Sequence, residues 1–486
     1  MRPLVFERVV IDGIPAYIGN DTGPITAGLV FRAGTADEEP LERGITALVA
    51  ELAAIEADAS FEVDEAVTSI IVSGNAKDVS AALDTACTTL SDLDADDLAD
   101  LADSVLGSAR VSSLAADLMS LRFGTRSYGT ASLPPLFCFH PTAAAAKEWV
   151  LQWFTRGNAM VWSTGPLTAD ATLPLGGGAR RDAPGTPASI ISTPAWTVLE
   201  QPLVSAHAVV APSAATTVTL RAIASEIRER AGDAHLDDAS LECRLTSWSA
   251  DAARVTIQLR APANTNDYIE LVLGTIDDFA ESGPDPDELT EAITNVEEWA
   301  MRRENAAEVG ALLCRNELLS GRTRTLDDYL ADIGAVSGGQ VAQAAGAIRD
   351  ALLVAVPDDG EIIDERFTEV GPVIAEPLDG NRYASTSAES LPGAPDTLVV
   401  GSEGVSMTLY DVTMTVRYDD CVAAVRYVDD AVSLYGADGT AIDVAARDWV
   451  DGLAAISAIE SAVPGDRIAR TETLLHAGRS DDDAEL

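Results

Sequence analysis

The sequence predicts an α+β protein with two similar halves, each an antiparallel-rich sheet packed under helices, and a smaller β-rich domain with one helix. Three observations lead to this fold class. The same order of strand, turn and helix occurs twice, two stretches rich in Gly and Pro interrupt the chain, and its last part alternates apolar and polar residues over short runs. We expect domains at 1–175, 190–372 and 397–480.

The repeat consists of two strand patterns and two helical patterns in each half. They lie at 26–34, 44–55, 66–74 and 79–93 in the first half, and at 204–212, 218–230, 253–261 and 268–282 in the second. Val67 and Val255 occupy matching places, 188 positions apart. The same order of elements, repeated at a nearly constant distance along the chain, indicates an internal structural repeat.

A long amphipathic helical run follows at 285–319, where Asp285 suits the N-cap and Pro286 the first helical position. The stretches Pro174–Ser189 and Glu376–Asp396 have the composition of linkers. Beyond them the sequence gives five or six short strands joined by hairpin turns, then one helix from about 448 to 462. This order of elements resembles a pleckstrin-homology-like domain.

The charge of the chain excludes some classes of partner. Its 486 residues include 78 acidic and 32 basic residues, a formal net charge of −46. A nucleic-acid-binding protein needs a basic face, and an anionic membrane repels an acidic one, so we expect neither partner. Two explanations of the bias remain: solubility, including life in a salty cytoplasm, or an acidic chamber that attracts basic peptides.

The five cysteines are scattered, without the CxxC spacing of a zinc knuckle and without a disulfide pattern. The N-terminus lacks the apolar region of a signal peptide, and no run of about 18 apolar residues could span a membrane. We therefore expect a cytoplasmic protein.

The helix expected at 44–55 follows a strand and an acidic loop in a specific frame. Its members are Phe31, Gly34, Asp37, Glu38, Gly44 and Ile45. This frame resembles the M16 (insulinase, pitrilysin) metallopeptidase family, in which such a helix carries an inverted zinc motif, His-x-x-Glu-His. In the family, two imidazoles one turn apart hold zinc and the carboxylate deprotonates the bound water.

The zinc motif is degenerate at all three positions. Ala47 stands at the first His, Ala50 at the catalytic Glu and Glu51 at the second His. The family's third ligand, a Glu some 70–80 residues further on, has no counterpart, because no Glu occurs between Glu65 and Glu148. The resemblance therefore implies a protein without zinc, other metal or cofactor, and without peptidase activity of its own. Taken alone, Glu51 is a solvated or salt-bridged helix residue.

A second pattern, "SEIRERAGDAH" at 225–235, resembles the family's Arg and Tyr pair, which are seven residues apart and hydrogen-bond the substrate backbone. Arg228 takes the Arg position and His235 the Tyr position. The resemblance thus implies substrate binding by Arg228 and His235. The alternative is a surface arginine on a helix and a loop histidine.

Two functions follow from the resemblance. The first is a non-catalytic M16-like subunit that pairs with a zinc-bearing homologue, or with itself, and helps to bind and process peptides. The helix at 268–274 and a sheet edge near Ala27–Gly34 would then line the chamber. The second is a structural or interaction scaffold that keeps an M16-like shell, with no role in proteolysis.

Overall fold

The first half of the chain is built on a six-stranded mixed sheet. A computed structural model describes residues 4–93, 96–108, 114–199, 201–234, 236, 240–261, 265–371, 375–386, 396–409 and 412–471. The strand order is β1-β2-β6-β3-β5-β4, with β2 and β6 parallel and the other neighbours antiparallel. The strands are β1 (Phe6–Ile11), β2 (Ile14–Gly19), β3 (Ile25–Phe31), β4 (Ser60–Val63), β5 (Thr68–Gly74) and β6 (Ala159–Ser163).

The second half repeats this sheet. Its order is β12-β7-β11-β8-β10-β9, in which β7 and β11 are parallel, as β2 and β6 are, beside an antiparallel run. The edge strand differs, since β12 is parallel to β7 whereas β1 is antiparallel to β2. The repetition predicted from the sequence is thus confirmed. The strands are β7 (Ala195–Leu199), β8 (Leu203–Val210), β9 (Leu241–Ser247), β10 (Ala253–Arg260), β11 (Leu353–Pro357) and β12 (Thr368–Glu369).

Each sheet is covered on one face by helices of its own half. On the first sheet, α1 (Ile45–Glu56) and α2 (Ala76–Ser91) bury alternate strand residues such as Leu29 and Ile70. On the second, α6 (Ala214–Asp233), α7 (Thr265–Ser282) and α11 (Gly338–Asp350) do the same for residues such as Ala206 and Ile257. Burial of one face of a sheet under an apolar helix stripe accounts for the α+β class predicted from the sequence.

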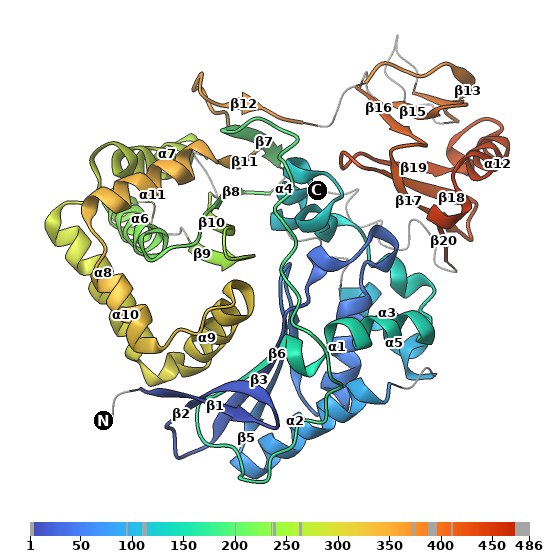
Figure 1. Cartoon of the computed structure of the whole chain (residues 1–486). Helices are drawn as coiled ribbons and strands as arrows, with labels where there is room; N and C mark the ends of the chain where they lie inside the picture. Colours follow the sequence, from blue (N-terminus) through green and yellow to red (C-terminus); the bar gives the residue numbers. More distant parts are fainter. Residues whose placement is uncertain are drawn as a thin grey trace.

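The opposite face of each sheet is covered by a helix from the other half (Figure 1). On the first sheet, α9 (Ala306–Ser320) lies against β2, β3 and β6, where Trp162 is buried beside it. On the second, α4 (Leu114–Phe123) lies against β11, with Met119 and Phe123 in one cluster with Leu353. Each half therefore supplies one helix that covers the second face of the other half's sheet.

The run at 285–319 forms two helices rather than one. Asp285 caps α8 (Pro286–Met301) as predicted, because its Oδ1 accepts hydrogen bonds from the backbone N–H groups of Asp287 and Glu288, at 2.8 and 2.9 Å. The helical pattern stops at Arg302, whose backbone is extended, and α9 begins at Ala306. This break turns the chain, so that α9 leaves its own half and reaches the first sheet.

The segment 174–189 has no regular secondary structure, but it is held along its length. The guanidinium of Arg180 donates to the backbone carbonyl of Glu317 in α9, and the hydroxyl of Tyr128 donates to the carbonyl of Pro184 at 3.0 Å. The predicted linker therefore packs across both halves.

The C-terminal part forms two four-stranded sheets that share one core with α12 (Gly452–Ala462). Within the second expected linker, β13 pairs with β14, so this stretch contains a strand. The pleckstrin-homology-like resemblance and the domain bounds stay predictions. The strands are β13 (Gly380–Ala384), β14 (Thr397–Gly401), β15 (Gly404–Leu409), β16 (Val412–Arg417), β17 (Cys421–Tyr427), β18 (Ala431–Gly436), β19 (Ala441–Ala445) and β20 (Ile468–Arg470).

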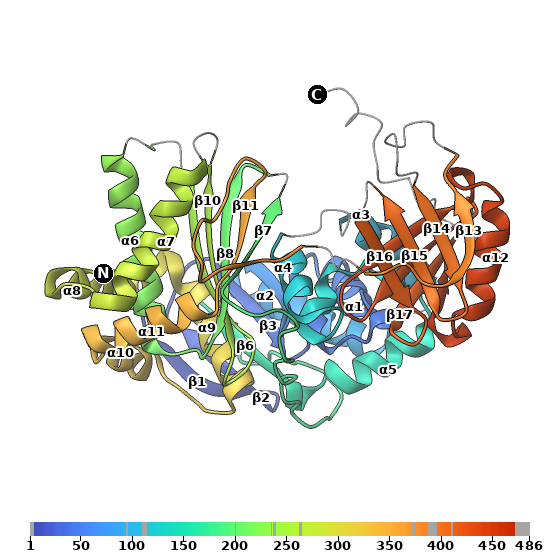
Figure 2. The same ribbon diagram turned by 90° about the horizontal axis from the view of Figure 1, so that it is seen from above.

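This C-terminal unit packs on the first half (Figure 2). Leu136 lies in one apolar cluster with Val425 and Tyr427, and the hydroxyl of Thr125 donates to the carbonyl of Gly436 at 2.8 Å. Among the described helices, none combines the length and the apolar content needed to cross a membrane.

Candidate functional site

The three degenerate zinc positions lie on α1, as the sequence predicts, but they do not form a metal site. Ala50 is fully buried and Ala47 half-buried. The half-buried Glu51 accepts a hydrogen bond from the hydroxyl of Ser104 on α3 (Asp96–Ser108), at 2.5 Å. Two methyl groups and one carboxylate cannot replace two imidazoles and a general base, so these residues do not fit zinc.

The histidines do not supply the missing ligands. His140 is exposed after a 3₁₀ turn, His207 is buried in β8, and His235 and His476 lie outside the described residues. In the described ranges there is no group of three His, Cys, Asp or Glu side chains that could hold a metal ion.

The acidic loop before α1 has a structural role. The buried carboxylate of Glu38 accepts hydrogen bonds from the backbone N–H groups of Gly44 and Thr46, at 3.0 and 2.9 Å, and pairs with Arg43. A carboxylate at a helix N-terminus satisfies free N–H groups and interacts favourably with the helix dipole. Asp37 forms a buried ion pair with Arg32. Glu38 and Asp37 therefore have structural partners, and Glu38 holds the N-terminus of α1.

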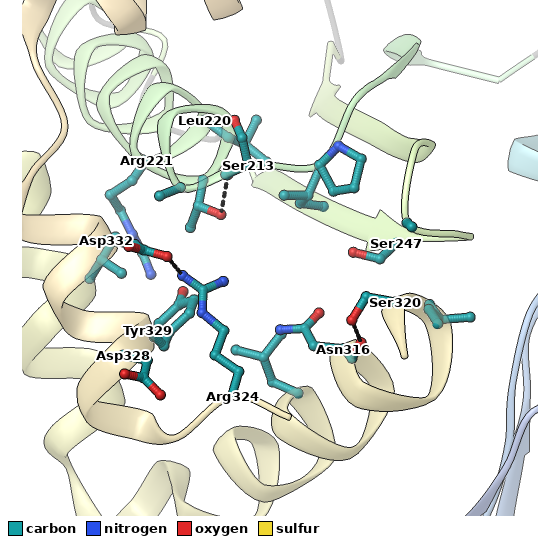
Figure 3. Close-up of a pocket in the computed structure, with 18 of the residues that line it drawn as sticks. Ser213, Leu220, Arg221, Ser247, Asn316, Ser320, Arg324, Asp328, Tyr329 and Asp332 are labelled. Carbon is teal, nitrogen blue, oxygen red and sulfur yellow. Dashed lines mark hydrogen bonds and ion pairs between the residues drawn. The ribbon is translucent and has the colours of Figure 1, made fainter. Parts of the chain in front are cut away.

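One predicted site residue lines a cavity of about 750 Å³ in the second half. The cavity lies between α6, β9, α8, α9 and α10 (Leu326–Gly334), and Figure 3 shows the side chains that converge on it. Arg228 is one of its lining residues. The other predicted member of the pair, His235, lies outside the described residues.

Arg228 sits on the exposed side of α6, and its guanidinium donates a 3.2 Å hydrogen bond to the carbonyl of Ala224. On the same helix face, one and two turns earlier, lie Ala224 and Arg221, which also line the cavity. Arg221 was not among the residues predicted from the sequence. Its spacing of seven from Arg228 was the available signal, because residues seven apart share a helix face.

Neither segment expected to line a chamber lines this cavity, and the expected sheet edge is wrong. The strand around Ala27–Gly34 lies between β5 and β6, so it offers no free edge to a peptide. The helix at 268–274 belongs to α7, whose Tyr268, Ile269 and Val272 are buried in the core of the second half. Both segments were chosen for their strand or helix pattern, which does not distinguish core from cavity.

His207 is a structural residue of the second sheet. Its ring nitrogens hydrogen-bond the hydroxyls of Ser205 and Thr256, at 2.8 and 3.4 Å. Full burial, with a smaller effect of the charges on Arg254 and Arg122, lowers the pKa of His207 to about 3. The imidazole is therefore neutral near physiological pH and is fixed by its partners.

The architecture is similar to that of several solved structures. A chain of Complex III2 from Candida albicans with Inz-5 bound gives a TM-score of 0.58 at 14% identity, over 72% of this chain and 95% of that one. The inactive domain of peptidase M16 from Pseudomonas fluorescens gives 0.56 at 16% identity, over 72% and 98%. A protein described as an M16-like peptidase from Alicyclobacillus acidocaldarius gives 0.59 at 11% identity, over 74% and 99%. The chain has an M16-like fold.

The M16 likeness predicted from the sequence is thereby confirmed at the level of the fold. No protein-family model and no curated protein sequence matches the chain. The alignments cover nearly all of each M16-like neighbour but only about three quarters of this chain. Since roles of single residues do not follow from a shared fold, they have to be argued from this chain's own side chains.

Proposed function

We propose that this chain is a non-catalytic M16-like subunit that binds peptides and assists a zinc-bearing M16-like homologue in processing them. The single observation that carries the proposal is the combination of a helix, α1, whose motif residues do not fit zinc and a cavity lined by Arg228. A peptide-binding surface is kept, whereas the hydrolytic site is lost.

The separation of the two regions supports a role within a pair. Every residue that lines the cavity belongs to the second half, between Pro212 and Asp332, whereas Ala47, Ala50 and Glu51 lie in the first. Figure 1 places α1 and α6 on opposite sides of the first sheet. Hydrolysis at the cavity would therefore need a zinc site from a second chain. One solved structure with this fold is itself part of a multi-subunit assembly, Complex III2.

The proposal is tested by reconstitution. The purified chain is mixed with an M16-like protein of the same source that carries His-x-x-Glu-His, and complex formation is measured by size exclusion with light scattering. Cleavage of a fluorogenic peptide is then compared for the native chain, Arg228→Ala and the matched exposed control Arg260→Ala. We expect a complex, and a loss of at least about tenfold in kcat/KM for Arg228→Ala alone. Chelator-sensitive cleavage with stoichiometric zinc in the isolated chain would contradict the proposal.

A second candidate is a structural or interaction scaffold, and the C-terminal unit favours it. This unit packs on the first half through Leu136 and Thr125. A scaffold, alone or as a homodimer, would use this extra surface to bind a partner. It predicts that Arg228→Ala leaves both assembly and cleavage unchanged.

A further inference from the structure

The cavity in the second half carries more basic than acidic side chains, although the chain as a whole is strongly acidic. Four arginines line the cavity, Arg221, Arg228, Arg322 and Arg324, against two carboxylates, Asp328 and Asp332. This occurs in a chain with 78 acidic and 32 basic residues. The local charge thus opposes the overall charge.

Both carboxylates are already used by neighbours. Asp332 pairs with Arg324. Asp328 accepts hydrogen bonds from the backbone N–H and the hydroxyl of Thr325, at 3.0 and 2.7 Å, which closes the capping box of α10. Among the described residues, neither acid forms an ion pair with an arginine of α6.

Arg221 and Arg228 have no carboxylate within ion-pair distance in the part of the chain that the structure describes. Elsewhere, arginines such as Arg8, Arg254 and Arg366 each have at least one. Seven helical residues correspond to a rise of about 10.5 Å. The lining residue between them is the small Ala224, whose carbonyl accepts a 3.2 Å hydrogen bond from the guanidinium of Arg228.

Figure 3 shows Arg221 on α6 and Arg324 on the segment before α10 reaching into the same space. Cys243 on β9 also lines the cavity, and the charges of Arg228 and Arg221 act on the pKa of its thiol. Burial raises the pKa of Cys243 to about 12, although both guanidinium groups act in the opposite direction. The thiol is therefore neutral and does not balance the arginines either.

One part of the cavity wall is apolar, and the rest carries polar side chains such as Asn316 and Thr217. The apolar part is lined by Leu245 of β9, Val296 and Trp299 of α8 and Leu312 of α9. Ligand sites of about 300–1,000 Å³ with a mainly apolar lining and a few placed polar groups enclose most of a small ligand. An occupant that suits this cavity combines a negative group with an apolar one.

We propose that the cavity binds a peptide through a carboxylate that lies next to an apolar side chain, with Arg221 and Arg228 holding the carboxylate and the wall around Trp299 holding the side chain. Arginine binds carboxylates by paired, charge-assisted hydrogen bonds, which gives both affinity and orientation. The inference deepens the proposed function by naming the substrate class. It also contradicts the expectation of a chamber selective for basic peptides.

The carboxylate can come from an acidic side chain or from the peptide C-terminus, and the test distinguishes the two. Three fluorescein-labelled peptides share one leucine-rich sequence: one ends in a free carboxylate, one is amidated with an internal Glu, and one is amidated with Gln in its place. Their affinities for the full-length chain are measured by fluorescence anisotropy. We expect at least one carboxylate peptide to bind about tenfold or more tightly than the neutral one.

The matched variants are Arg221→Gln and Arg260→Gln, with folding checked by circular dichroism. Arg221→Gln should remove the preference for the carboxylate and leave the neutral peptide unaffected, whereas Arg260→Gln should change nothing. Equal binding of all three peptides, no binding up to about 1 mM, or an unchanged preference in Arg221→Gln overturns the inference. If the reconstituted pair cleaves charged and neutral peptides alike, the proposed function stands and only this inference falls.

Discussion

Arg8 on β1 and Glu317 on α9 are joined by two hydrogen bonds, of 3.1 and 2.6 Å, across the boundary between the two halves. The hydroxyl of Tyr17 donates a third to the same carboxylate, at 2.7 Å. Two further ion pairs, Arg315 with Asp64 and Arg254 with Glu65, also join the halves. The exchange of helices is thus fixed by charged groups as well as by apolar packing.

Substitution of Glu317 by Gln should destabilise the fold. Glu317 is buried and Arg8 about one third exposed. Loss of a buried partner leaves charges unpaired, but solvent near Arg8 reduces the effect, so we expect a loss of about 2–3 kcal/mol in the free energy of unfolding by urea. The control is Glu403→Gln, which breaks an exposed pair with Arg417 and should cost below about 1 kcal/mol. Equal effects of the two substitutions would show that the ion pair between Glu317 and Arg8 does not stabilise the fold.

Restoring the motif residues should not restore metal binding. In a triple variant with Ala47→His, Ala50→Glu and Glu51→His, two imidazoles would face a site that lacks the third protein ligand. We expect little zinc after dialysis, below about 0.1 equivalents by atomic absorption. Stoichiometric zinc in the variant would show that another side chain completes the site.

His207 should make stability fall with acidification. Its pKa in the folded state is about 3, mainly because of burial, and about 6.5 in the unfolded chain. Between these values the unfolded state binds one more proton, so the contribution is full above about pH 6.5 and is lost as the pH falls toward 3. His207→Gln should reduce the pH slope of the unfolding free energy by up to about 1.4 kcal/mol per pH unit. Parallel slopes from urea melts at about pH 7 and pH 5 would contradict this assignment.

Trp248 should be important for packing between the halves. It is fully buried, and its ring stacks on that of Tyr128, with centroids 4.1 Å apart and planes 9° apart. Trp248→Ala is expected to cost about 3–5 kcal/mol through lost burial and the cavity left behind. The control Leu453→Ala, at a side chain that is 61% exposed, should change the melting temperature little. A small effect of Trp248→Ala would mean that the neighbouring helix α4 closes the gap.

The candidate site could be predicted from the sequence only in part. Arg228 was predicted from a pattern and lines the cavity, whereas Arg221 was not predicted and the two segments expected to line a chamber do not line this cavity. A side chain's helix face follows from its spacing, but whether that face is buried or borders a cavity depends on elements far away in the sequence. Here those elements are α8, α9 and α10.

By itself, the sequence determined the α+β class, the repeat, the cap of α8 and the loss of the zinc ligands, because these depend on local periodicity and on residue identity. Tertiary structure alone decided that α4 and α9 cover each other's sheets, that the first linker is held, and which arginines share a cavity. These depend on where the chain turns, as at Arg302, and on contacts between residues some 300 positions apart, such as Arg8 and Glu317. A pattern confined to one helix carries no information about such partners.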